Sequence, residues 1–455
     1  MRSHPTGSRH RAATALAALL GAALLLPAAA GAVTCTVDAV PAATLLLPYF
    51  EVDLDDPNGL TTLFAVRNAA AEAVLAHVAV WSDLAVPVAN FNVYLTGYDA
   101  QSFNLRDLLV HGSVPRTAAS GQDPDDTISP KGRLSEDAAF PSCAGLLPPA
   151  PMSADLLAHL QSALTGRPSP LASGLCLGRN LGDRVARGYV TIDTVRDCTL
   201  RYPGDAGYFA AGGAGDATDQ NVLWGGWHIV DSAHDVAEGG NLVAIEADAG
   251  NPATSTAGRY TFYGRYDGWT GIDHREPLAT GFASQFAFGG PFSAIVDLIV
   301  WRDPKVAQQP FPCPVKPGTS PAWYPMIQEG FGLFDEEEHP IVTVAFPFEA
   351  PPFVPLMPFP AAAQRTRLGG SAFPVPYNFG WLYFDLNSIG FSVQRDPASD
   401  PASAQAWVIA VLSSKGRFAT GIDAYRLDSA CAPFHGQGIP LYTGGPGAPG
   451  LSQPF

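Results

Sequence analysis

The chain has 455 residues, of which 47% are hydrophobic and 15% charged, so it can bury large cores and a globally disordered chain is excluded. Its 42 acidic and 26 basic side chains give a formal net charge of −16, which disfavours nucleic acids and anionic membranes as partners. At about 150 residues per domain, this length predicts two to three modules.

The first 32 residues have the layout of a secretory signal peptide. Arg2, Arg9 and Arg11 precede an apolar run at 12–27, and small residues follow up to Ala32. A membrane-spanning helix is the alternative, but it needs about 20 apolar residues, more than this run provides. We therefore predict cleavage after Ala32, no membrane span, and export to the periplasm, the cell surface or the medium.

Strand and turn patterns fill the stretch that follows this leader. Apolar residues occupy both alternating faces of 74–81, which is typical of a strand covered on both sides. The pair Asn58-Gly59 is typical of a hairpin turn. The acidic residues Asp53 and Asp55 before it resemble part of a calcium loop, but Pro57 occupies a ligand position, which favours a solvated turn.

One helix is predicted near residues 153–165. Ser153 is a candidate N-cap, leucines recur every four residues, and Gly166 with Pro168 ends the pattern. The helix is an insert in the first predicted module, residues 33–185.

Strand patterns return at 189–195 and continue to the end of a second predicted module, residues 186–312. The third module, residues 313–431, has strand candidates at 341–346, 381–386 and 407–412, and a flexible tail, 432–455, follows. Together these patterns predict a mostly β fold of two to three β-sandwich-like modules with one short helical insert.

Six cysteines lie in the exported part of the chain, at positions 35, 143, 176, 198, 313 and 431. An even number in an oxidising compartment favours disulfides, although about 15 pairings are possible for six cysteines. We predict Cys313–Cys431, which would close the third module, and Cys143–Cys176, which would flank the helix.

The motifs of common catalytic and cofactor sites are absent. The sequence contains no nucleophile elbow, zinc-protease, phosphate-loop or haem-attachment motif. It therefore predicts no catalytic residue, no metal and no cofactor.

The densest candidate for a ligand-binding site combines aromatic and charged side chains in the middle module: Trp224, Trp227, Asp267, Trp269 and Glu276. Exposed tryptophan rings stack on sugar rings, and nearby charged groups orient hydroxyls. The alternative is that the tryptophans are core residues, as tryptophan usually is. If a ligand site exists, we expect it here, and the acidic surface favours a neutral ligand.

Five stretches carry a resemblance to known proteins: TTLFAVRNAAAEAVLAHVAVWSD, NVYLTGYDAQSFNLRDLL, NVLWGGWHIVDSA, GRYDGWTGIDHREPL and NFGWLYFDLN. They are similar to a group of uncharacterised exported bacterial proteins, and the first resembles strands of immunoglobulin-like β-sandwiches. The resemblance implies export and a β-sandwich fold. It implies no catalytic residue.

The predicted function is that of a non-enzymatic exported protein that binds or structures extracellular material, with a neutral glycan or an extracellular protein as partner. The alternative is a secreted glycan-active hydrolase. That enzyme would need two carboxyl groups that face each other at about 5 to 9.5 Å in a cleft.

Overall fold

The computed structural model describes most of the chain after the leader. The described residues are 39–117, 133–134, 138–210, 215–258, 261–268, 270–304, 307–314, 321, 330–337, 340–341, 359–370, 375, 377–386, 405–415 and 418–427. All of them belong to one compact unit, Thr34–Phe455. The predicted signal peptide and the predicted tail lie outside the described residues.

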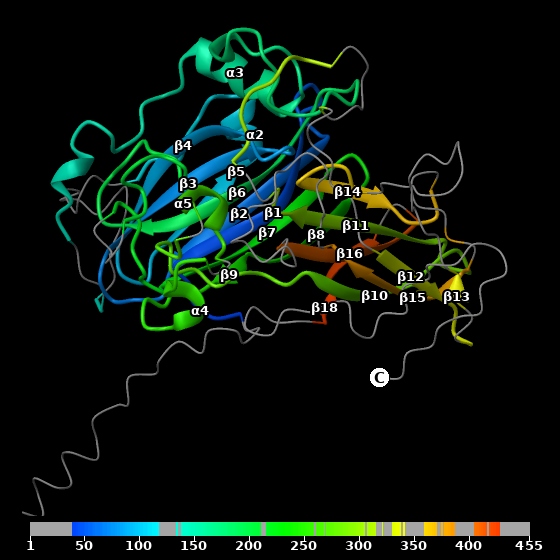
Figure 1. Ribbon diagram of the computed structural model, residues 1–455. Helices are drawn as coiled ribbons and strands as arrows, with labels where there is room; N and C mark the ends of the chain where they lie inside the picture. Colours follow the sequence, from blue (N-terminus) through cyan, green and yellow to red (C-terminus); the bar gives the residue numbers. More distant parts are fainter. Residues whose placement is uncertain are drawn as a thin grey trace, which may run out of the picture. The chain divides into compact units, whose positions relative to one another are not determined.

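Nine strands of the N-terminal half form two antiparallel sheets (Figure 1). The first sheet has the order β4(Pro87–Leu95), β3(Val74–Ser82), β6(Val185–Val195), β1(Thr44–Asp53), β9(Val243–Ile245). The second has the order β5(Ala100–Asn104), β2(Leu60–Asn68), β7(Leu223–Asp231), β8(Val236–Asn241). Because β1 packs against β2 and β7, the two sheets face each other as a sandwich.

The C-terminal half contributes two further antiparallel sheets. The third has the order β14(Ala363–Arg367), β11(Ala294–Arg302), β16(Ala406–Ser414), β17(Phe418–Asp423). The fourth has the order β13(Pro340–Ile341), β12(Gly330–Phe334), β15(Phe379–Asp385), β10(Gly281–Ala287), β18(Tyr425–Arg426). Contacts of β10 with β11 and β16 place these two sheets face to face.

The third sheet is covered on both faces. On β11, Leu298 and Val300 pack into the core of the C-terminal half, whereas Ile299 and Trp301 pack into the large core built on β1, β3 and β6. This double burial explains why β11 and β16 are apolar along nearly their whole length, without polar alternation. The two halves therefore share a buried layer.

The mostly β fold with a short helical insert is confirmed. The predicted helix is α3(Ala154–Leu164), whose N-cap Ser153 accepts a hydrogen bond from Leu156 N, and Gly166 follows with a φ of +62°. The other helical segments are shorter: α2(Leu105–Leu109), α4(Pro252–Ser255), α5(Gly264–Asp267), η1(Pro141–Cys143) and η2(Pro170–Ala172). No described helix has the length and apolar character needed to cross a membrane.

The predicted hairpin at Asn58-Gly59 is wrong. The strands on either side, β1 and β2, belong to different sheets, so this turn links two layers instead of two paired strands. Its acidic residues cap the turn, because the Asp53 carboxylate accepts hydrogen bonds from the backbone N–H groups of Asp55 and Asp56.

Strand pairing crosses the predicted module boundaries. The central strand β6 begins at Val185 and pairs with β1 and β3 of the first predicted module. Likewise β11 of the second predicted module pairs with β14 and β16 of the third. The boundaries themselves stay a prediction, and of the predicted strand 341–346 only Ile341 lies within the described residues.

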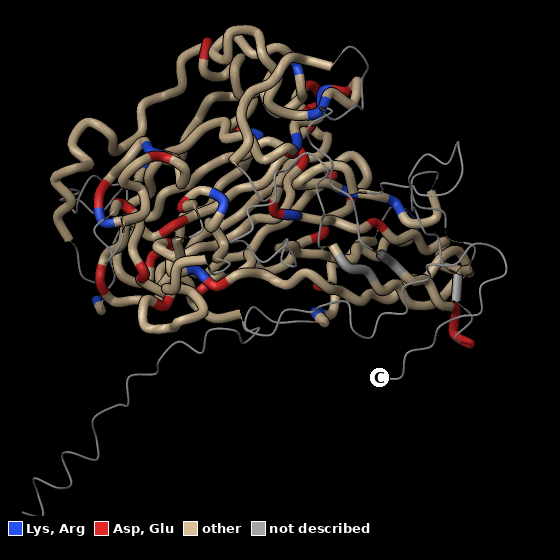
Figure 2. The backbone as a smooth tube through the Cα atoms, in the orientation of Figure 1, with Lys and Arg blue, Asp and Glu red and all other residues tan. Residues whose placement is uncertain are grey.

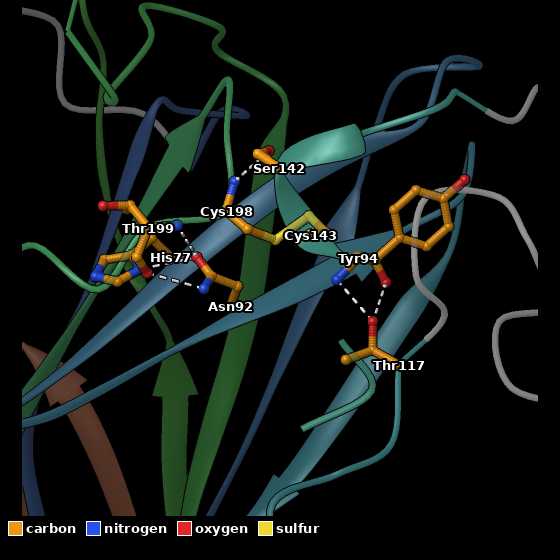
Figure 3. The surroundings of a disulfide bond; sticks show 8 residues. All are labelled: His77, Asn92, Tyr94, Thr117, Ser142, Cys143, Cys198 and Thr199. Atoms are coloured by element: carbon orange, nitrogen blue, oxygen red, sulfur yellow. Dashed lines mark hydrogen bonds between the residues drawn. A yellow bond between two sulfur atoms is a disulfide. The ribbon is translucent and has the colours of Figure 1, made fainter. Parts of the chain in front are cut away.

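Both predicted disulfides are wrong, because the described cysteines pair as Cys143–Cys198 and Cys176–Cys313, each with a Cα–Cα distance of 5.0 Å. Figure 3 shows Cys143 against the segment that follows β6, where Cys198 N donates to Ser142 Oγ. Cys176 exchanges backbone hydrogen bonds with Phe311, which brings Cys313 within reach. Cys35 and Cys431 lie outside the described residues.

Candidate binding site

Two of the three tryptophans of the predicted site, Trp224 and Trp227, lie on opposite faces of β7. Trp227 is fully buried, and its Nε1 donates to Asn241 O at 3.1 Å. Trp224 is 46% exposed, and Arg67 on the neighbouring strand β2 lies over its ring at 4.7 Å. A spacing of three residues in a strand sends side chains to opposite faces. Trp227 is therefore a core residue, which corrects its assignment as a ligand-stacking ring.

The two charged residues of the predicted site, Asp267 and Glu276, are not freely exposed to solvent. The carboxylate of Asp267 accepts hydrogen bonds from the backbone N–H groups of Thr270 and Ile272, both at 3.1 Å, and so caps the turn after α5. Glu276 is only 7% exposed. Trp269 lies outside the described residues, so Trp224 is the described aromatic of this set that solvent reaches.

Beneath this region lies a buried polar centre on Asp193 of β6. Its carboxylate is fully buried and accepts hydrogen bonds from the hydroxyls of Thr44, Tyr208 and Tyr263. Burial beside this carboxylate raises the pKa of both tyrosines well above the ordinary value. Arg275 extends the network by donating from Nε to Thr44 Oγ1 at 3.0 Å. Because these groups are enclosed and hydrogen-bonded to one another, their role is structural.

The same region contains an aspartate with a strongly shifted pKa. Asp273 is fully buried, and its carboxylate accepts hydrogen bonds from the backbone N–H groups of Tyr263 and Arg275. Burial, together with the nearby Asp267 carboxylate, raises the pKa of Asp273 to about 7. The neighbouring His274 has a raised pKa, because its Nδ1 lies 2.6 Å from the carboxylate of Asp219.

A second buried polar group joins the middle of the chain to the C-terminal half. Arg265 and Asp303 form a fully buried ion pair at 3.1 Å. The side chain of Gln405, next to β16, donates to both Asp303 Oδ2 and Thr261 O. Breaking a buried pair of this kind is strongly destabilising, because one charge is left uncompensated. These residues therefore hold the fold together.

A third cluster, the Arg365 cluster, lies between β8, β1 and β11. The guanidinium of Arg365 contacts Glu238 at 2.6 Å, Asp297 at 3.1 Å and Glu51 at 3.8 Å. All three acidic residues are buried, with at most 7% of each residue exposed. Burial raises the pKa of Glu238, whereas the neighbouring arginines hold the pKa of Asp297 below its usual value.

An apolar groove opens at the edge of the C-terminal sandwich, and we call it the β10 groove. Its volume is about 170 Å³, and it is lined by one end of β10 with parts of β15, β16, β17 and β18. The apolar side chains at its mouth are accessible: Leu412 is 38%, Ile422 58% and Tyr425 65% exposed. Figure 2 shows no charged residue along β10 or β16. Sequence reasoning missed this site, because the groove arises where the chain crosses between two sheets.

Comparison with known proteins adds little. No protein-family model matches the chain, and no curated protein is similar to it. Among solved structures, a chain titled "Biofilm associated protein - BSP domain" aligns over 88% of this chain and 62% of its own length, with 9% identity and a TM-score of 0.16. A TM-score this low shows neither a shared fold nor a shared function.

The fold and its candidate sites define a class: a disulfide-linked β-sandwich protein whose buried charges are used in structural contacts. Among the accessible features of the described residues are the β10 groove and the exposed ring of Trp224.

Proposed function

We propose that this protein is exported, and that it binds or structures extracellular material without catalysing a reaction. The observation that carries the proposal is the pair of disulfides, which link positions 55 and 137 residues apart in the sequence. Disulfides form and persist in oxidising compartments, and they fix the ends of long loops. A durable β framework outside the cytosol is what such crosslinks provide.

The use of the buried charges supports a binding or structural role. Asp193 is enclosed by hydroxyl donors, Arg265 pairs with Asp303, and Arg365 holds three carboxylates at a junction of strands. Groups held in this way stabilise a fixed surface. They do not need to change protonation during a reaction cycle.

The ligand class within this proposal is a neutral glycan or an extracellular protein. Trp224 supports glycan binding, because its half-exposed ring is placed on a strand and oriented by Arg67. Aromatic rings held in this way present a flat apolar face at low entropic cost. The net charge of −16 disfavours an anionic polymer.

Fractionation of cells that make the full chain tests export. We expect the protein outside the cytosol, with Cys143–Cys198 and Cys176–Cys313 oxidised. A cytosolic protein with reduced thiols would contradict the proposal.

A second measurement separates binding from catalysis. The purified protein is assayed for retention on neutral polysaccharides and for turnover of glycan and ester substrates. We expect retention without turnover, and weaker retention for Trp224→Ala than for Phe418→Ala, which removes another exposed aromatic ring on β17. Turnover of any substrate would favour the glycan-active hydrolase instead.

A further inference from the structure

The β10 groove lies where the chain leaves one sheet for the other. Strand β17 pairs with β16 up to Asp423, opposite Ile409. Two residues later, Tyr425 pairs with Ala283 on β10 in the opposite sheet. Ala424 marks the switch, because its N–H still donates to Val408 O on β16. The chain therefore crosses between the two sheets at a single residue.

Among the described residues, this crossing leaves part of the β10 edge without a paired strand. Strand β18 covers β10 only at Phe282 and Ala283, whereas β15 covers the opposite edge as far as Ala287. If β18 continued in the same register, Asp423 would lie beside Gln285, but Asp423 belongs to β17. Within the part of the chain that the structure describes, no strand lies beside residues 285–287 on this edge.

Some backbone groups of β10 point away from β15, toward the edge that β18 covers further along the strand. Thr280 O and Phe288 N bond to the β15 side, whereas Gly281 O bonds to Leu427 on the β18 side. Backbone groups alternate in direction along a strand, so those of odd-numbered residues face the β18 edge. The N–H groups of Gln285 and Ala287 therefore point to the open edge. An exposed edge with such groups is a template for strand pairing.

Apolar side chains line the groove beside this open edge. Leu412 of β16 and Ile422 of β17 face the groove from the opposite sheet, and Phe286 lines its floor. A strand placed beside 285–287 would set the side chains of alternate residues into this groove. Main-chain hydrogen bonds combined with pockets for alternate side chains are the features of β-strand addition.

We propose that the β10 groove accepts an extended peptide strand of a partner protein, with apolar side chains at alternate positions and a neutral or basic charge. The strand would continue the pairing that β18 already makes with β10 on the same edge. Its charge follows from the net charge of −16. This proposal deepens the proposed function, because it names the partner class of a binding protein.

Fluorescent peptides test the proposal on the full chain. The probe is a capped peptide of about seven residues that alternates threonine and valine between two terminal lysines, a length that spans the open edge. Its control carries N-methyl groups at alternate residues, which remove backbone donors. We expect saturable anisotropy for the probe and at least about tenfold weaker binding for the control, as loss of main-chain pairing requires. A version with glutamates at the ends should bind more weakly.

Three variants locate the binding. Leu412→Glu places a charge in the groove, and Gln285→Pro removes a donor on the open edge, where proline is tolerated. Both should weaken binding about tenfold or more, whereas Phe418→Glu, an equal charge change at an exposed position outside the lining, should leave it unchanged. If Leu412→Glu fails to fold, Ile422→Glu at a more exposed position replaces it.

Several outcomes would overturn the assignment. They are no saturation with any peptide, equal binding of the N-methylated control, and binding unaffected by Leu412→Glu. A concentration-dependent dimer abolished by Leu412→Glu would assign the groove to a second copy. Binding only after truncation at Leu427 would assign it to the chain's own C-terminal segment. Each result is independent of export and turnover, so the proposed function can stand while this proposal fails.

Discussion

Replacing Arg365 by methionine removes the positive charge of the Arg365 cluster and keeps an apolar side chain of similar reach. Glu238 then loses both hydrogen bonds that Arg365 donates to its carboxylate, at 2.6 and 3.1 Å. Arg365 is its ion-pair partner among the described residues. Asp297 keeps Arg367, and Glu51 keeps Arg187. Glu238 is thus the carboxylate that the substitution leaves buried without its arginine.

The expected loss of unfolding free energy in Arg365→Met follows from the burial of Glu238. The side chain of Glu238 is 3% exposed and that of Arg365 22% exposed, so solvent screening is limited. Removing one partner of a buried ion pair costs about 3 to 5 kcal/mol of unfolding free energy. Arg367, whose side chain is 56% exposed, also contacts Asp297, and Arg367→Met should cost about 0 to 1 kcal/mol.

Urea unfolding of the two variants at several pH values measures these costs. Burial raises the pKa of Glu238, and losing Arg365 would raise it further. A carboxyl with a raised folded-state pKa stabilises fully below its unfolded pKa and loses that effect as the pH rises. The deficit of Arg365→Met should therefore shrink at about pH 5, and adding Glu238→Gln should recover part of it at pH 8. Equal losses for the Arg365 and Arg367 variants would refute the reasoning.

Three further predictions follow from the described contacts. The pKa of about 7 at Asp273 means that its stabilising effect is complete below about pH 4 and is lost as the pH rises to about 7. Asp273→Asn should flatten that part of the stability profile in urea unfolding, and an unchanged slope would contradict the assignment. Trp227→Ala should cost about 3 to 5 kcal/mol in thermal or chemical unfolding. Trp224→Ala should cost less than about 1 kcal/mol, and similar losses would show that both rings are core residues. Non-reducing peptide mapping should recover Cys143–Cys198 and Cys176–Cys313, and replacing Cys143 and Cys198 by alanine should cost about 2 to 5 kcal/mol. Any other partner for these cysteines would show that the strands around them pair differently.

The strands were predictable because burial leaves a local pattern. The run at 74–81, apolar on both faces, is the inner strand β3, and the capped leucine pattern after Ser153 is α3. Both patterns involve only residues that are close together in the sequence and belong to the same helix or strand. Local patterns of this kind therefore predicted the fold class.

Pairing between distant segments was not predictable from such patterns. The register that places Thr44 opposite Asp193 joins residues 149 positions apart, and no local signal specifies it. The disulfide predictions failed for the same reason, because they assumed that cysteines bracketing a segment would meet. Cys176 instead reaches Cys313 through a bridge with Phe311.

The predicted ligand site was wrong in part, and the alternation of side chains along a strand could have shown this from the sequence. Trp224 and Trp227 look adjacent in the sequence, but the period of two in a strand separates them by face. The β10 groove was out of reach, because it arises where one residue, Ala424, crosses between sheets. Such a crossing is a property of the assembled sandwich.

The position of β1 has a consequence for how the protein is made. It is the first described strand, it is buried along almost its whole length, and its neighbours on the two sides are β6 and β9. A chain that emerges N-terminus first presents this apolar strand unpaired until β6, which ends at Val195, has appeared. The other edge of β1 stays open until β9, which ends at Ile245, follows. Late pairing of this kind slows folding and leaves an edge that other chains can join. The yield of folded protein therefore depends on what shields β1 during synthesis.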